Sequence, residues 1–165
     1  MRSQLIAVSA AVLLAFSLTG CITIQLPGGT PVTAPDDNDN SQLISCSDDE
    51  QLTEPGSYVL QGACPLVTIE GTDIEIEADT VVQLIIRGDR NTADVDSLSD
   101  VTISGTNNEV EAPSAAQVEI AGDRNQVDID EGIDSLVING NDNDIEVGTE
   151  ITTVSDGGER NSIGH

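Results

Sequence analysis

Apolar and polar residues alternate on both sides of a glycine that recurs along the chain. The glycines, spaced 17, 17, 17, 18 and 18 residues apart, are Gly71, Gly88, Gly105, Gly122, Gly140 and Gly158. The positions two and four residues before each glycine, and five and seven after it, hold 24 residues, of which all but Asp156 and His165 are apolar. Alternation with a period of two on each side of a turn predicts two β-strands, each with one buried face.

An asparagine stands three residues after five of the six glycines. These residues are Asn91, Asn108, Asn125, Asn143 and Asn161. Asparagine tolerates left-handed backbone angles and stacked amides hydrogen-bond to one another, so we expect a structural asparagine ladder at the turn, with the glycine permitting the bend. A further apolar position recurs late in each repeat and predicts a third side of the coil: Val81, Leu98, Ala115, Ile133 and Ile151.

A repeat of this length with three sides predicts an all-β protein, a parallel β-helix (solenoid) of about six coils of 17–18 residues. Equivalent residues of successive coils would stack about 4.8 Å apart. Left-handed β-helices usually show a strict hexapeptide period, which this chain lacks, so a right-handed coil is favoured. Asp156 and His165, at positions that are apolar in the other repeats, are expected to cap the open end of the stack.

The first residues have the pattern of an export signal. Arg2 precedes an uncharged apolar run, residues 5–16, that is too short to span a bilayer and suits a signal peptide. The run leads into Leu-Thr-Gly-Cys ending at Cys21, which resembles the bacterial lipobox, where the cysteine is acylated after cleavage. We therefore expect a lipoprotein signal peptide at 1–20, a lipidated Cys21, a Pro-, Gly- and Asp-rich tether at 21–42, and the solenoid domain at 43–165. The alternative is a plain secretory signal whose Cys21 enters a disulfide.

Two further cysteines, Cys46 and Cys64, are 18 residues apart, which is one coil length. Stacked residues at about 4.8 Å fall within the Cα range of a disulfide, and an even pair in an exported protein is usually bridged. We expect this bridge to fasten an irregular first coil, residues 46–63, onto the regular stack as an N-terminal cap. The alternative is two unpaired thiols.

The chain resembles a known family in three features. These are a first coil bounded by two cysteines, the V-x-I-x-G-x-x-N-x-V units that follow it, and the lipobox that precedes both. Over residues 46–163 the chain resembles small bacterial lipoproteins of an uncharacterised family, the domain-of-unknown-function 3060 type. The resemblance implies no activity, because the family has none established. The stretch of residues 54–71 also resembles the opening of right-handed β-helix proteins of the pectate-lyase type, which supports the handedness and not catalysis.

Composition narrows the function. The chain carries 30 acidic residues against five arginines, a formal net charge of −25, with one Tyr, one Phe, no Trp and a single histidine. Such a charge repels nucleic acid, so no nucleic-acid partner is expected. Without aromatic side chains there is no platform for stacking bases or sugar rings. A single histidine argues against a Ser-His-Asp triad or a histidine-rich metal site.

Many acids fall at outward positions of the predicted coils. Six residues after the glycines stand Glu77, Asp94, Glu111, Asp128 and Glu146, and four residues after them stand Glu75, Glu109 and Asp144. Neighbours in such a column would repel by about 0.8 kcal/mol in water. Ca²⁺ bound by the first column, or high ionic strength, would offset this repulsion, whereas the simplest interpretation is a solvated face that resists aggregation. In the turns, Arg90, Arg124 and Arg160 are expected to pair with acids. The candidate partners are the neighbouring Asp89, Asp123 and Glu159, or Asp73 and Asp142.

These observations predict a lipid-anchored, extracytoplasmic β-solenoid of the cell envelope with a structural or interaction role and no enzymatic activity. Its expected partners are the membrane, through the anchor, and an envelope protein or glycan. One alternative is an acidic surface protein that binds Ca²⁺ as its only cofactor. A less favoured alternative is a β-helix protein acting on polysaccharide, because coils that vary by one residue leave no loop to build a cleft.

Overall fold

The computed structural model describes residues 41–164; the predicted signal peptide, Cys21, most of the predicted tether and His165 lie outside the described residues. Within this range the protein is all-β, and no described helix is long and apolar enough to cross a membrane. Thirteen strands form one sheet system. In chain order they are β1 Gln42–Ser45, β2 Glu50–Leu52, β3 Gly56–Ile69, β4 Ile74–Ile86, β5 Thr92–Val95, β6 Leu98–Ile103, β7 Glu109–Ala112, β8 Ala115–Ile120, β9 Gln126–Ile129, β10 Ile133–Ile138, β11 Asp144–Val147, β12 Ile151–Asp156 and β13 Ser162–Gly164.

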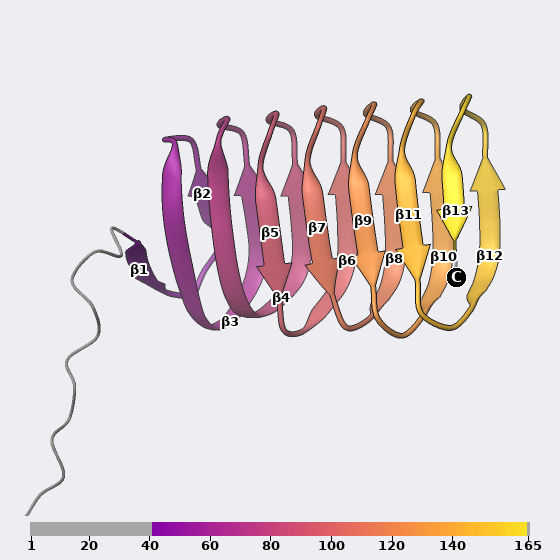
Figure 1. The fold of residues 1–165 in the computed structure, drawn as a ribbon. Coiled ribbons are helices and arrows are strands. Elements are labelled where there is room, and N and C mark those ends of the chain that lie inside the picture. Colours follow the sequence, from indigo (N-terminus) through magenta and orange to yellow (C-terminus); the bar gives the residue numbers. More distant parts are fainter. Residues whose placement is uncertain (1–40, 165) are drawn as a thin grey trace, which may run out of the picture. The chain divides into compact units, whose positions relative to one another are not determined.

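The strands stack in parallel, each on its equivalent one coil later, as a parallel β-solenoid of about seven turns (Figure 1). One row of strands runs from β5 through β7, β9 and β11 to β13, and the other from β6 through β8 and β10 to β12. The long strands β3 and β4 contribute to both rows. The predicted fold class is therefore confirmed, with one more turn than the glycine repeats indicate, because β1 and β2 also stack on β3.

The coil is right-handed. In Figure 1 the nearer strands β5 to β13 run downward and the fainter, more distant strands β6 to β12 run upward, while the chain advances from left to right. This sense of rotation agrees with the handedness that the sequence favours.

The inward positions form a single apolar core. The inward residues of the strands between the two ends of the stack are buried, as in β10, where Ile133, Leu136 and Ile138 are at most 2% exposed. The apolar position late in each repeat, which the sequence assigned to a third side, does not form a strand of its own. Its residues Leu98, Ala115 and Ile133 are the first residues of β6, β8 and β10. Narrow coils accommodate Val, Ile, Leu and Ala, which explains why aromatic side chains are nearly absent.

The recurring glycine is required by close packing between coils, whereas the sequence suggested that it permits the bend. A Cβ on Gly105 would overlap the carbonyl oxygen of Gly88 in the preceding coil, and the same relation holds along the whole column. The left-handed backbone lies one residue before the asparagine, with φ between 55° and 59°. The residues that adopt it are Asp73, Arg90, Asn107, Arg124, Asp142 and Arg160.

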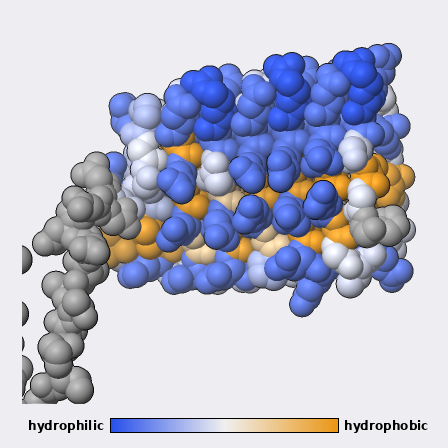
Figure 2. Space-filling view, in the orientation of Figure 1, coloured by the Kyte–Doolittle hydropathy of each residue, from blue (hydrophilic) through white to orange (hydrophobic). Residues whose placement is uncertain are grey.

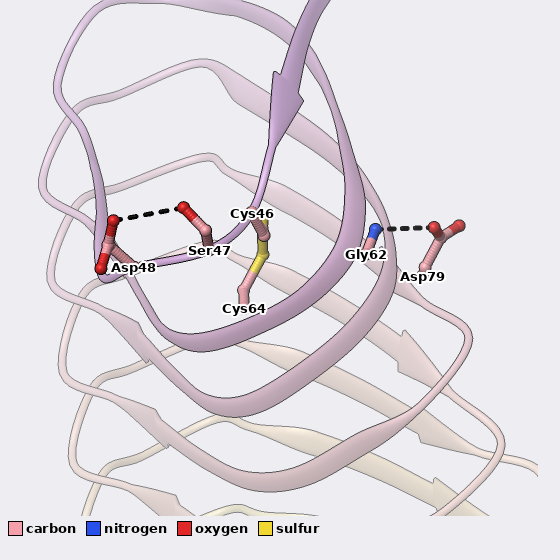
Figure 3. The surroundings of a disulfide bond; sticks show 6 residues. All are labelled: Cys46, Ser47, Asp48, Gly62, Cys64 and Asp79. Carbon is pink, nitrogen blue, oxygen red and sulfur yellow. Dashed lines mark hydrogen bonds between the residues drawn. A yellow bond between two sulfur atoms is a disulfide. The ribbon is translucent and has the colours of Figure 1, made fainter.

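The N-terminal turn is fastened to the next coil by a disulfide. Cys46 and Cys64 are paired with their Cα atoms 4.9 Å apart, close to the strand spacing (Figure 3). Near the bridge, the backbone N–H of Gly62 donates a hydrogen bond to the Asp79 carboxylate. The Tyr58 hydroxyl donates to the carbonyl of Glu54 at 2.9 Å. The predicted pairing of the two cysteines is therefore confirmed. Both strands of the N-terminal turn, β1 and β2, also pair with β3 of the next coil.

Candidate functional site: the acidic face

The outward side chains of β4, β5, β7, β9 and β11 form a surface that we call the acidic face. Its first column is in register along the coils, and each member pairs with the next across the sheet: Glu77, Asp94, Glu111, Asp128 and Glu146. The second column consists of Glu75, Thr92, Glu109, Gln126, Asp144 and Ser162. Both columns lie where the repeat positions place them, because parallel pairing keeps equivalent residues in line.

A third row of acids, which the sequence reasoning missed, borders the first column. Asp79, Asp96 and Asp130 stand eight residues after their glycines, where each front strand gives way to the corner. Three shallow hollows lie between this row and the first column; one of them is lined by Asp94, Asp96, Glu111, Asp128 and Asp130, among others. Figure 2 views this side of the solenoid and shows rows of hydrophilic side chains with apolar surface between them. The recurrence at eight residues after the glycine is the signal that would have found the row.

Within residues 41–164, no ion pair includes an acid of this face. The ion pairs found in residues 41–164 all lie in or next to the glycine turns, where Arg87 binds Glu70, Arg90 binds Asp73, and Arg160 binds Asp142 and Glu159. Glu111, in the middle of the first column, has a raised pKa because of desolvation and then because of the charges of Glu109, Asp94, Asp128 and Asp130. Desolvation and the neighbouring charges thus both disfavour the charged form of this central carboxylate.

No metal-binding cluster is formed by this face. Among the described residues, no group of three or more acidic, histidine or cysteine side chains converges on a point that could hold a metal ion. Carboxylates in straight columns point outward in parallel, whereas a Ca²⁺ ion needs six to eight oxygens around it. The arrangement can attract cations along its length, but it does not enclose one with its own side chains.

The asparagine column forms a continuous ladder in the glycine turn. From Asn108 onward, each Oδ1 accepts hydrogen bonds from the backbone N–H and the Nδ2 of the preceding asparagine, and each Nδ2 also donates to a glycine carbonyl. At the start of the ladder, Asn91 Oδ1 accepts from the backbone N–H of Ile74. Asn91, Asn108, Asn125 and Asn143 are at most 2% exposed. No buried polar side-chain atom in the described range lacks a partner.

Asp156 ends the ladder. Its Oδ1 accepts from Asn161 Nδ2 at 2.8 Å and from the Gly158 N–H at 2.9 Å, in the place that a further asparagine oxygen would take. The last strand of its row, β12, is largely exposed, as expected for the end of the stack. The capping expected of Asp156 therefore has a specific geometry, whereas His165 lies outside the described residues.

The turn arginines pair along the coils and not only with their sequence neighbours. Arg90 donates two hydrogen bonds of 2.9 Å to Asp73, and Arg160 donates to both carboxylate oxygens of Asp142. These pairs lower the pKa of Asp73 and of Asp142, first through the hydrogen bonds. Arg124 instead donates to Asn107 Oδ1 at 3.2 Å.

Comparison with known proteins adds no relative. No family model matches the chain, and neither a curated protein nor a solved structure does.

Proposed function

We propose that this protein is a lipid-anchored envelope protein whose solenoid serves a structural or interaction role. The observation that carries the proposal is the regularity of the described domain behind a lipobox-like sequence. Every coil from β5 to β12 has two strands joined by a corner of two or three residues and closed by the same glycine turn, and none carries an inserted loop. A surface built by repetition is suited to lying along a partner, whereas β-helix enzymes commonly build a cleft from longer loops.

The acidic face supports a position at the envelope surface. Uncompensated carboxylates repel the anionic headgroups of a membrane, so the solenoid would stand away from the bilayer while the lipid holds the chain to it. The Pro-, Gly- and Asp-rich segment between Cys21 and the first strand has the composition of an extended, solvated connection. Several acyl chains on one cysteine would make the attachment stable.

Metabolic labelling with a clickable fatty acid tests the anchor. We expect the wild-type chain to carry the label and to partition into detergent, and Cys21→Ala to carry none. The matched control is the double variant Cys46→Ala/Cys64→Ala, which removes two cysteines and should keep the label. Label on Cys21→Ala, or none on the wild type, would refute the proposed anchor.

A second candidate function is the accumulation of cations on the acidic face, favoured by the first column, in which each carboxylate stands in register with the next. Calcium should raise the melting temperature more than an ionic-strength-matched sodium salt does. Asp128→Asn should reduce this difference, whereas Asp134→Asn, on the other row of strands, should leave it unchanged. Equal effects of the two salts would leave only screening and remove this candidate.

A further inference from the structure

The second row of strands presents a face of different character from the acidic face. We call it the neutral face; it comprises the outward side chains of β6, β8, β10, β12 and the second halves of β3 and β4. Over the four central strands, two of its columns are Ile85, Thr102, Glu119 and Val137, and Gln83, Asp100, Gln117 and Ser135. Only two of these eight residues are acidic, against six of the eight equivalent residues of the acidic face.

This difference is not required by the fold, because both faces are built from the same parallel stack with apolar residues inside. Ile85 and Val137 are partly exposed on the neutral face, and Val82 beside it is 49% exposed. Charged residues are depleted from the centres of protein interfaces, so a weakly charged face on a chain of net charge −25 is the surface on which a partner can pack.

The residues of each column would match those of the same column in a second copy whose coils run in the opposite direction. If a second copy lies face to face with its coils running in the opposite direction, Ile85 of one copy faces Val137 of the other. Thr102 then faces Glu119, and the hydroxyl can donate to the carboxylate. Asp100 faces Gln117, whose amide can donate to it, and Gln83 faces Ser135. Asp100 and Glu119 thus each meet a neutral donor, Asp134 in the adjoining outward column lies against Val82, and no carboxylate meets another.

We propose that the neutral face joins two copies of this chain, antiparallel about a two-fold axis that runs along the strands between β6 and β8. A parallel arrangement would place Ile85 against Gln83 and Glu119 against Gln117, which separates the two apolar residues. The antiparallel arrangement is isologous, as most homodimer interfaces are.

The size and charge of the neutral face suit this occupant. Six strands of six residues cover about 29 Å by 20 Å, so two copies would bury about 1,200 Å², just above the roughly 1,000 Å² of a specific interface. The acidic faces would point outward, about 30 Å apart across the two solenoids and their interface. That separation exceeds the Debye length of about 8 Å at physiological salt, so their mutual repulsion is screened.

Cross-linking of the exported full chain in cells tests the arrangement. The double variant Ile85→Cys/Val137→Cys, treated with a bismaleimide that spans about 10 Å, should give a covalent dimer of twice the chain mass. Each single variant should give much less, because the two copies of one position are offset by three coils, about 14 Å along the stack. The matched control Glu77→Cys/Asp128→Cys has the same coil spacing on the acidic face and should give no dimer.

A charge introduced at the interface provides a second measurement. Thr102→Glu is added to the Ile85→Cys/Val137→Cys chain. Because the two-fold axis repeats the contact, the new carboxylate faces Glu119 of the other copy at two points, and self-association should weaken by about tenfold or more. Thr92→Glu, in the same coil on the acidic face, should leave the dimer unchanged. An unchanged melting transition identifies the variants that fold. The proposal is overturned if the folded Ile85→Cys/Val137→Cys chain gives no dimer, dimerises no more than the acidic-face control, or links to a protein of another mass. Lipidation of Cys21 does not enter this result.

Discussion

Asn108 lies in the middle of the asparagine ladder and makes four side-chain hydrogen bonds. Its Oδ1 accepts from the N–H and the Nδ2 of Asn91 at 2.9 and 3.1 Å, and its Nδ2 donates to the Gly88 carbonyl and to Asn125 Oδ1 at 3.0 and 3.1 Å. Asn108→Ala would remove all four bonds. The N–H of Asn91 and the carbonyl of Gly88 would then be left without these partners, in a turn whose asparagines are buried.

Each buried backbone group left unpaired costs about 1–3 kcal/mol, so we expect Asn108→Ala to lower the free energy of unfolding by about 3–5 kcal/mol. This is a large part of the 5–15 kcal/mol typical of a domain. The assay is equilibrium urea unfolding followed by circular dichroism, with the disulfide intact and a second probe to establish a single transition. The midpoint should fall while the slope with denaturant stays the same.

The matched control is Asn161→Ala at the end of the ladder. Asn161 makes the same bonds to Asn143 and to Gly140, but it is only partly buried, so water can replace them. We expect a loss of about 1–2 kcal/mol there. The reasoning is refuted if Asn108→Ala costs less than about 1 kcal/mol, or if the two substitutions cost the same.

Three further predictions follow from close packing, charge and the disulfide. Gly105→Ala should lower the free energy of unfolding by about 3 kcal/mol or more, because its Cβ would overlap the Gly88 carbonyl. The control Gly164→Ala, whose Cβ would lie 3.9 Å from the Ile145 oxygen, should be nearly neutral. Thermal melts compare the two variants, and equal losses would contradict this account. Glu111→Gln should raise stability at neutral pH and low salt by less than about 1 kcal/mol. Because the pKa of Glu111 is raised in the folded state, protonation already relieves the repulsion as the pH falls through that pKa, so the gain should disappear in acid; a gain that persists there, or at high salt, would show another cause. Reducing the disulfide between Cys46 and Cys64 frees a loop of 18 residues and should lower the free energy of unfolding by about 3 kcal/mol. Urea unfolding with and without reductant measures this difference. A difference near zero would show that the N-terminal turn is held without the disulfide.

The architecture was predictable because each coil repeats the same local pattern. The alternation around Gly88, Gly105 and Gly122 identifies which residues face inward, and the constant spacing places equivalent residues in line. The paired cysteines and the first acidic column follow from the same arithmetic.

Details that depend on how one coil meets the next were not predictable in this way. The sequence suggested that the glycine bends the chain, whereas the structure shows that Gly105 is required by the closeness of Gly88. The left-handed positions hold Asp73, Arg90 and Asn107 in successive turns, so no single residue type marks them in the sequence. The acidic row of Asp96 and Asp130 was missed because Pro113 and Gly148 interrupt it.

The sequence by itself determined the repeat, the inward and outward positions, and the columns, because period and spacing are properties of the chain alone. Only the tertiary structure decided which atoms those columns bring together. It placed Asp156 at the end of the asparagine ladder, directed the arginine pairs along the coils, and separated an acidic face from a neutral one. The physical reason is that each of these contacts joins residues 17 or 18 positions apart or lies at the open end of the stack, so it exists only once the coils have closed on one another.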